Sequence, residues 1–459
     1  MTFALYFGNR GLFPAELIDG SRKALIKAVT ENGYDYIVME ENATRYGAVE
    51  TIAEGEVYKA FLKQNEGKYD GVILSLPNFG DENGVQTALA DCGVPILVQA
   101  FPDEAGKMDF AHRRDAFCGK FAICNVLRQS GIPFSLTREF AVAPDTESFA
   151  EDLHRFAAIC RTVKKMRRFK VGVFGARTTP FKTTRYDEYA LERKGVTVET
   201  FDLAELFLRM DNMDPAIFSE TKAELAAYAD FSKTSDKQLE NMARFVAAVE
   251  ETVKTYGLAA VAIRCWNEFE AKYMISPCVG MSYLIEKGIP ASCETDVTNA
   301  VMMLAMQLAS GTPVMLLDVN NNYGNDPDKC ILFHCGVAPR SMMTEHPYVG
   351  DHLSFIKTVG PTVGPAFGGL ITGDVTLGSV RTDDGRVHSF LAEGELCDDE
   401  IESSFFGIRT VLHKQNLPFM LNYMARNGYK HHTVVAKGKV ADVVREVFTV
   451  YLGYENDMI

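Results

Sequence analysis

Residues 164–175, KKMRRFKVGVFG, mark the point at which one α/β pattern ends and a second one begins. The stretch opens on the basic end of an amphipathic pattern over 147–167, which predicts a long helix whose last turn carries cations, as the helix dipole favours. Residues 170–175 then form an apolar run that closes on a glycine, which predicts a new buried strand followed by a turn. We therefore expect a domain boundary at about residue 168.

On the N-terminal side of this boundary, short apolar runs alternate with helical patterns. The expected strands are 2–8, 35–39, 70–75 and 95–100, and the expected helices are 15–32, 46–65, 84–92 and 115–131. This alternation predicts a parallel sheet covered by helices on both faces.

The C-terminal side repeats the pattern and then changes character. Strands at 170–175, 196–201 and 259–264, with helices at 215–231 and 235–256, predict a second α/β unit. Residues 365–396 instead combine short strand-like pieces with glycine turns, and Asp383-Asp384-Gly385 is a hairpin signal. A last helix is expected at 439–452.

The predicted fold class is therefore α/β, with two consecutive α/β domains that contain parallel sheets, followed by a β-rich domain. The expected domains are 1–168, 169–308 and 309–459, the last of which completes the functional site.

Composition excludes several classes of partner. The chain has 459 residues, of which 47 are Lys or Arg and 61 are Asp or Glu, giving a net charge of −14. This balance argues against nucleic acid or an anionic membrane as the main partner. There is no apolar window of ~18 residues and no basic segment before the first apolar run, and the ten cysteines contain no CxxC pair. We expect a cytoplasmic protein with reduced thiols and a small-molecule substrate.

The most informative segment is CETDVTNAVMMLAMQLASGTPVMLLDVNNN, residues 293–322. Helical spacing over 296–309 is followed by a Gly-Thr-Pro stop and by a buried strand at 313–317. A helix of about 13 residues and an extended run of about six are each about 20 Å long. If the strand runs back beside the helix, Asp318 returns close to Glu294.

Two converging carboxylates can bind a divalent cation or act as an acid/base pair. The chain also offers His334 at the end of an apolar run, and the pair His431-His432 before the last helix. Carboxylate and imidazole ligands together suit Mn²⁺, Co²⁺ or Fe²⁺ better than a structural Zn²⁺.

Taken together, these segments resemble the superfamily of L-fucose isomerases and L-arabinose isomerases, which are metal-dependent aldose–ketose isomerases. The matching pieces are CETD at 293–296, LLDV at 316–319 and HHTVVAKG at 431–438, with Glu294 and Asp318 separated by 24 residues. The resemblance implies that Glu294, Asp318 and His432 hold Mn²⁺ or another divalent metal such as Co²⁺. It also places His334 near a further histidine ligand of the arabinose isomerases.

The resemblance also implies substrate contacts. RCW at 264–266 is similar to an Arg-x-Trp segment beside the family's pocket, and FGNRGLFP at 7–14 resembles a segment whose arginine, here Arg10, reaches a neighbouring subunit's site. A trimer or hexamer with active sites at subunit interfaces is the implied assembly. The expected substrate-binding residues are Arg10, Arg264, Trp266, Asn320 and His431.

The implied activity is aldose–ketose isomerisation of a free monosaccharide through an enediolate, with Glu294 and Asp318 sharing the proton transfers. The substrate is expected to be a sugar of the L-fucose or D-arabinose type, or a 6-modified hexose such as sulfoquinovose, which carries a sulfonate. The sulfonate would need a basic pocket, for which the candidates are Arg10, Arg177, Lys182 and Arg264. Two alternatives remain open, a sugar epimerase on the same scaffold and a non-catalytic sugar-binding module.

Overall fold

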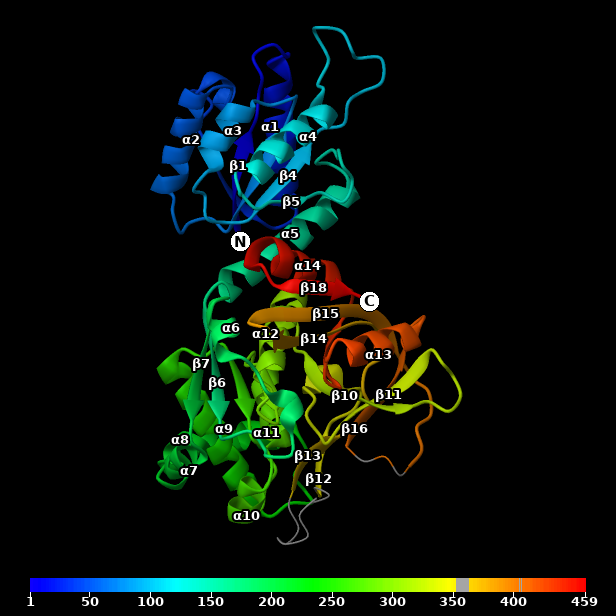
Figure 1. Cartoon of the computed structure of the whole chain (residues 1–459). Coiled ribbons are helices and arrows are strands. Elements are labelled where there is room, and N and C mark those ends of the chain that lie inside the picture. Colours follow the sequence, from blue (N-terminus) through cyan, green and yellow to red (C-terminus); the bar gives the residue numbers. More distant parts are fainter. Residues whose placement is uncertain (352–362, 404, 406) are drawn as a thin grey trace. The chain divides into compact units, whose positions relative to one another are not determined.

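The structure is a computed structural model that describes residues 1–351, 363–403, 405 and 407–459. The chain divides into two compact units, Met1–Lys164 and Lys165–Ile459 (Figure 1).

The first unit contains a five-stranded parallel sheet in the order β2-β1-β3-β4-β5. Its strands are β1 (Thr2–Phe7), β2 (Asp35–Val38), β3 (Gly71–Leu76), β4 (Ile96–Ala100) and β5 (Ser135–Leu136). Its helices are α1 (Glu16–Glu31), α2 (Ile52–Gln64), α3 (Glu82–Leu89), α4 (Ala116–Gln129) and α5 (Glu147–Met166). The predicted elements are thus present, with ends displaced by a few residues.

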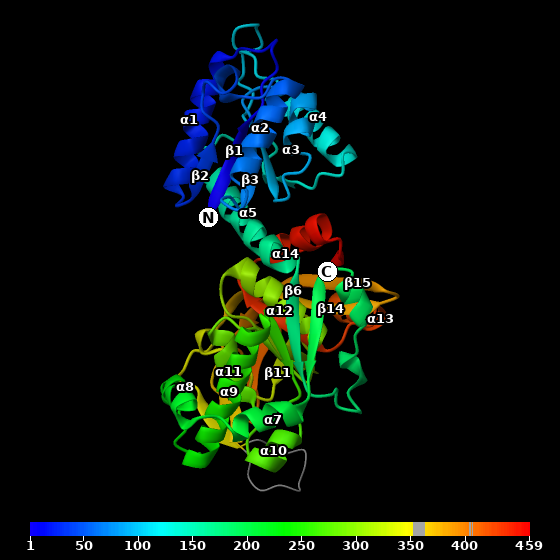
Figure 2. The same ribbon diagram turned by 90° about the vertical axis from the view of Figure 1, so that its left-hand side faces the viewer.

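Both faces of this sheet are buried. In β1, Ala4 and Tyr6 pack into one apolar cluster with residues of α2, α3 and α4, while Phe3 and Leu5 pack into another with residues of α1 and α5 (Figure 2). Alternate residues of a strand point to opposite faces, so a continuous apolar run is what a sheet covered on both sides requires.

The second unit begins with a four-stranded parallel sheet in the order β7-β6-β8-β9. Its strands are β6 (Phe169–Phe174), β7 (Val196–Phe201), β8 (Ala260–Ile263) and β9 (Ala291–Cys293). The helices are α6 (Glu188–Glu192), α7 (Leu203–Asp211), α8 (Pro215–Tyr228), α9 (Asp236–Tyr256), α10 (Glu268–Tyr273), α11 (Cys278–Glu286) and α12 (Val297–Ser310). Sequence patterns did not indicate α6, α7, α10 or α11. The first and third of these are only five and six residues long, and α11 is buried along nearly its whole length, which removes the polar face that gives a helical period.

The remainder of the second unit is rich in β-structure. A seven-stranded sheet has the order β14-β17-β10-β11-β16-β15-β18, and a further pairing of β14 with β15 closes six of its strands into a ring. The strands are β10 (Met315–Asn322), β11 (Lys329–His334), β14 (Gly373–Asp383), β15 (Arg386–Cys397), β16 (Ile408–His413), β17 (His432–Lys437) and β18 (Glu455–Met458). The other elements are the pair β12 (Tyr348–Asp351) and β13 (Val363–Phe367), with α13 (Leu417–Arg426) and α14 (Ala441–Glu446). A π-helical turn over Val447–Leu452 continues α14, so the helix expected at 439–452 is present.

The predicted hairpin at Asp383-Asp384-Gly385 joins β14 to β15. Asp383 pairs with Arg386, and the two residues between them have φ angles of 53° and 71°. Positive φ at both loop positions is the requirement of a two-residue type I′ turn, which Asp-Gly satisfies best.

Helix α12 connects the two sheets of the second unit. It packs against β8 and β9 of the parallel sheet and also against β14 and β17 of the ring. The residues just before α12 therefore lie where the carboxyl edge of the parallel sheet meets the ring.

The predicted fold class is confirmed, because parallel α/β sheets are followed by a β-rich region. The expected boundary at residue 308, inside the second unit, stays a prediction. All ten cysteines are free thiols. No helix within the described residues has the length and apolar character needed to cross a bilayer.

Candidate active site

Glu294 follows β9 in a strained backbone conformation. Its φ angle is 59°, and that of the next residue, Thr295, is 55°. Two consecutive non-glycine residues in the left-handed region cost free energy, and such strain persists where the surroundings fix the conformation, often at functional sites. Here Thr295 donates its N–H to Ile263 O at 3.2 Å, and the Asp296 carboxylate accepts Asn299 N–H at the start of α12. The turn therefore holds Glu294 in one orientation.

The closed ring of six β-strands supplies the opposite wall of the site. Asp318 in β10 is the direct antiparallel partner of His432, the first residue of β17, and β11 flanks β10 on its other side. Directly opposed residues of neighbouring strands project from the same face of a sheet. The strand register alone thus brings the carboxylate of Asp318 to the imidazole of His432.

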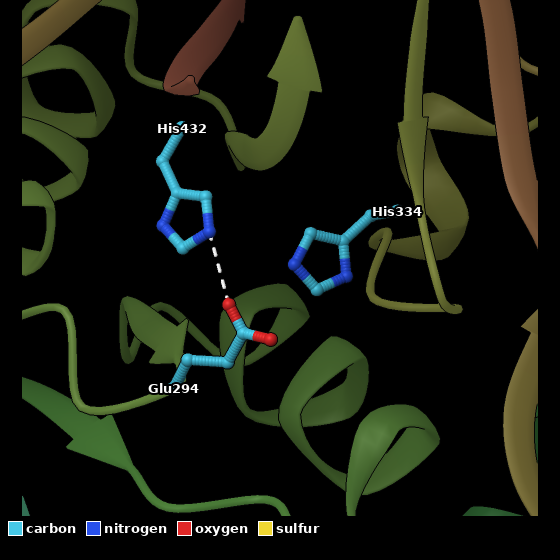
Figure 3. A group of neighbouring side chains, drawn as sticks. All are labelled: Glu294, His334 and His432. Carbon is cyan, nitrogen blue, oxygen red and sulfur yellow. Dashed lines mark ion pairs between the residues drawn. The ribbon is translucent and has the colours of Figure 1, made fainter. Parts of the chain in front are cut away.

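The two carboxylates converge on one ring nitrogen. His432 Nε2 lies 3.0 Å from Glu294 Oε2 and 3.4 Å from Asp318 Oδ1. The other oxygen of Glu294 accepts the indole N–H of Trp266 at 3.0 Å. Figure 3 shows the rings of His432 and His334 approaching the Glu294 carboxylate from two sides. The expectation that Asp318 returns towards Glu294 is therefore met, since both reach the same histidine.

Two of these atoms are buried without a hydrogen-bond partner. They are Asp318 Oδ1 and His432 Nε2, and the His432 ring as a whole is 1% exposed. Buried polar atoms are costly unless something binds them. A divalent cation accepting both lone pairs would remove that cost, so the donor set fits a metal.

The site offers two overlapping groups of ligand atoms. Glu294, His334 and His432 form one group, and Asp318, His431 and His432 form the other, with the atoms of each group within 4.8 Å of one another. Oxygen and imidazole nitrogen donors suit Mn²⁺, Co²⁺ or Fe²⁺.

In the absence of a cation, His432 and the carboxylates around it attract one another electrostatically. Burial opposes protonation of His432, but the nearby carboxylates of Asp296 and Glu294 outweigh it and raise the pKa of His432 to about 10. Burial likewise opposes ionisation of Glu294, yet its contacts with His432 lower the pKa of Glu294. A proton on Nε2 and a cation at Nε2 exclude each other, so binding of a cation must displace the proton.

His334 has a different hydrogen-bond pattern from His432. Its Nδ1 accepts the backbone N–H of Cys335 at 3.0 Å, and its side chain is buried. An accepting Nδ1 carries no proton, so the neutral ring of His334 carries its proton on Nε2.

Comparisons with known proteins show which family the chain belongs to. Residues 4–167 match the fucose/sulfoquinovose isomerase N-terminal domain, and residues 332–459 match the L-fucose isomerase C-terminal domain. Curated relatives include the sulfoquinovose isomerase of Alkalicoccus urumqiensis, 23% identical over 397 residues, which are 84% of this chain and 86% of the relative. The sulfoquinovose isomerase of Priestia aryabhattai is 24% identical over 403 residues, which are 85% of this chain and 86% of the relative.

The chain belongs to the fucose isomerase-like family. It is accordingly an aldose–ketose isomerase that acts on a sugar. Among solved structures, a solute binding protein from Burkholderia multivorans has a TM-score of only 0.18 and 14% identity over 68% of this chain and 94% of its own, which bears on neither fold nor function.

Two residues of the RCW segment have internal partners in the isomerase. Trp266 holds Glu294, as described, and its indole lies 5.6 Å from the ring of Phe181. Arg264 makes two hydrogen bonds to the Glu268 carboxylate, at 2.7 and 2.8 Å, and a third to Ala176 O. The charge of Arg264 is therefore already balanced inside the protein.

The other expected substrate contacts differ in their surroundings. His431 Nε2 lies 3.8 Å from Asp318 Oδ1, at the edge of the cluster. Asn320 is exposed and sits at the bulge where β10 shifts register against β11. Arg10 lies in the first unit, where it donates to Gly80 O, pairs with Glu82 and stacks over Phe79. Their roles towards substrate stay predictions.

Sequence patterns missed three residues that shape the isomerase site. The Phe181 ring packs within 5.7 Å of the rings of His431 and His432, although it belongs to a loop after β6. Asp296 appeared only as the last residue of the CETD segment, and Lys430 carried no signal beyond its place before the histidine pair. Only the folded chain shows that these last two residues form a buried ion pair behind His432.

Proposed function

We propose that the protein converts sulfoquinovose, the sulfonated 6-substituted hexose named in its relatives, to the corresponding ketose with the aid of a divalent cation. The observation that carries the proposal is the convergence of Glu294 and Asp318 on the one available nitrogen of His432. The names of the curated relatives support this choice of sugar.

Glu294, Asp318 and His432 would hold the cation, with Mn²⁺ as the first candidate. Such a cation supplies Lewis-acid stabilisation of the negative charge that develops on the two substrate oxygens in an enediolate. Asp318 Oδ1 and His432 Nε2 are buried without a hydrogen-bond partner, which supports this ligand set.

The chain's own carboxylates account for the proton transfers. Isomerisation moves one proton between C1 and C2 and another between O1 and O2, and each transfer needs a base that can return the proton as an acid. Glu294 and Asp318 are the carboxylates that face the same point, so we assign the two transfers to this pair. Trp266 keeps Glu294 in place by binding the carboxylate oxygen that His432 does not.

We assign His334 the role of a hydrogen-bond donor rather than the ligand role expected from the sequence. Its Nδ1 already accepts the Cys335 N–H, which leaves a proton on Nε2 and no lone pair there for a cation. His334→Gln should then keep the wild-type affinity for Mn²⁺ and lower kcat, whereas Glu294→Gln should lower both. A large loss of Mn²⁺ affinity in His334→Gln would restore it to the ligand set.

A cavity beside Glu294 suits the sulfonate. It has a volume of about 260 Å³ and is lined by Arg177 and Arg185, by the hydroxyl-bearing Thr184, Thr200 and Thr295, and by Val173, Gly175, Ala176 and Tyr186. None of the described residues that line it is acidic, although the protein as a whole carries a net charge of −14. Guanidinium and hydroxyl donors without a competing carboxylate are what a sulfonate needs. Thr295 links this cavity to the neighbouring Glu294.

The activity is tested by NMR with protein that has been stripped with a chelator and reloaded with Mn²⁺. Sulfoquinovose should be converted to a ketose, and the conversion should stop with chelator and fall by orders of magnitude in Glu294→Gln. Mn²⁺ binding without turnover of sulfoquinovose would reject this substrate, and a C2-epimeric aldose as the product would favour the epimerase.

The sulfonate contact is tested by comparing sulfoquinovose with D-glucose. Arg177→Gln should lower kcat/KM for sulfoquinovose by about 10- to 100-fold, the value of one lost hydrogen bond to a charged group, and leave that for glucose unchanged. Arg193→Gln is the matched control, because Arg193 instead donates to Gly385 O and does not line the cavity. Equal effects on both sugars would place the sulfonate elsewhere.

A further inference from the structure

A second buried carboxylate stands behind His432, on the side away from the cation ligands. Asp296 is fully buried, and its Oδ2 lies 2.8 Å from His432 Nδ1. Lys430, itself 7% exposed, pairs with Oδ1 of the same carboxylate and donates to Thr298 Oγ1 at 2.6 Å. Both charges are thus buried, and each is satisfied by the other.

The hydrogen bonds of Asp296 determine where the proton of His432 sits. Oδ1 accepts from Lys430 Nζ, Thr298 Oγ1 and Asn299 N, while Oδ2 accepts from Asn299 Nδ2 and faces the imidazole. The Lys430 ammonium, the Thr298 hydroxyl and the two N–H groups of Asn299 all donate to this carboxylate, so both of its oxygens act as acceptors. His432 Nδ1, which lies 2.8 Å from Oδ2, must therefore be the donor and carry a proton. The lone pair of the neutral ring is then on Nε2, which faces Glu294 and Asp318.

We propose that Asp296 is a positioning residue that fixes the tautomer and direction of His432 for cation binding, and that Lys430 holds the Asp296 carboxylate in place. The inference rests on the proposed function, because it concerns the same cation site. Carboxylates that hold a histidine ligand from behind commonly contribute 10- to 100-fold in metal affinity or activity.

The capping role of Asp296 at α12 does not explain this arrangement. A cap requires only that one side-chain oxygen accept Asn299 N–H, which Ser or Asn would do about as well. It requires neither a buried lysine nor a contact with His432.

The test compares Asp296→Asn with Asp296→Ser. In the Asn variant, Lys430 Nζ and Asn299 N still donate hydrogen bonds, so the amide oxygen must take the place of Oδ1. The amide NH₂ then takes the place of Oδ2 and points towards His432. His432 Nδ1 must then accept, so the ring proton moves to Nε2 and the lone pair there is lost. Serine keeps the cap but does not reach His432, and it leaves the tautomer free.

Mn²⁺ affinity, measured from the electron paramagnetic resonance signal of the free ion, is the first readout. We expect a loss of about 10- to 100-fold in Asp296→Asn and a smaller loss in Asp296→Ser, although Asn is the closer match in size. Because Asp296 does not touch the reacting atoms, kcat in the Asn variant should recover when Mn²⁺ is raised about 100-fold. Asp152→Asn is the matched control, a buried aspartate of the first unit whose change should leave Mn²⁺ affinity untouched.

Wild-type Mn²⁺ affinity in Asp296→Asn, or a larger loss in Ser than in Asn, would overturn the inference and leave the proposed function standing. A loss of activity that saturating Mn²⁺ does not restore would also overturn it, because damage to the fold is not repaired by the ion. Absence of Mn²⁺ binding in the wild type would instead reject the proposed cation site. The wild type is therefore measured before any variant.

Discussion

At the scale of single residues, the buried charges of the active site are paired with one another. Asp296 with Lys430, and Glu294 with His432, are each buried ion pairs of the site. Lys120 in α4 is the contrasting case. It is fully buried, and its near contacts are Thr137 Oγ1 at 2.8 Å and the face of Phe140 at 5.0 Å, neither of which carries a charge.

The stability of the protein should therefore depend on pH through Lys120. Burial lowers the pKa of Lys120 to about 8, against about 10.5 in an unfolded chain. Between these values the unfolded chain binds more protons, so stability rises with pH across this window. Relative to Lys120→Met, the wild type should gain about 2 kcal/mol in free energy of unfolding from pH 7 to pH 10.

Urea unfolding at several pH values measures this difference. Lys63→Met is the control, because Lys63 is an exposed residue of α2 and its removal should not change the pH dependence. If the free energies of unfolding of the wild type and Lys120→Met differ by the same amount from pH 7 to pH 10, the prediction is contradicted.

At the scale of elements, the close packing of helix α4 against the backbone of a neighbouring loop helps to position that loop at the carboxyl edge of the first sheet. Gly119 lets α4 approach the loop after β3 so closely that a Cβ at this position would lie 2.5 Å from Phe79 Cα. The same loop carries Gly80, whose carbonyl accepts the Arg10 guanidinium, and Phe79, on which that guanidinium stacks. Helix packing and the placement of Arg10 are thus coupled.

Gly119→Ala should destabilise the protein by about 1–3 kcal/mol, because the added methyl must push α4 away from Phe79. In a helix with free space the same change normally stabilises by about 0.5–1 kcal/mol. Gly20 of α1 is such a position, with no atom within 4 Å of an added Cβ, and Gly20→Ala should raise the melting temperature. Thermal unfolding measures the melting temperature of each variant. If both substitutions shift the melting temperature in the same direction, the expected packing is contradicted.

At the scale of the whole molecule, the cluster of proposed cation ligands lies entirely within the second unit. Binding to the native state alone stabilises by about 2.7 kcal/mol at a ligand concentration 100 times Kd. Mn²⁺ should then raise the melting temperature of the second unit by about 5 °C and leave that of the first unit unchanged.

Differential scanning calorimetry with Mn²⁺ and with chelator measures this separation. His432→Gln should abolish the Mn²⁺-dependent shift. A shift in the transition of the first unit alone would place the cation outside the Glu294, Asp318 and His432 cluster.

The sequence by itself determined most of the elements and the chemical type of the site. Apolar runs give strands, Asp-Gly gives the β14–β15 turn, and the helix and strand between Glu294 and Asp318 have matching lengths, because each of these depends on local spacing. Only the tertiary structure decided what surrounds His432. Asp318 reaches it through strand register, and Lys430 pairs with Asp296 across 134 residues of chain. Contacts between distant residues leave no periodic pattern in a sequence. The ring tautomers of His432 and His334 therefore follow only from the folded neighbours of their ring nitrogens.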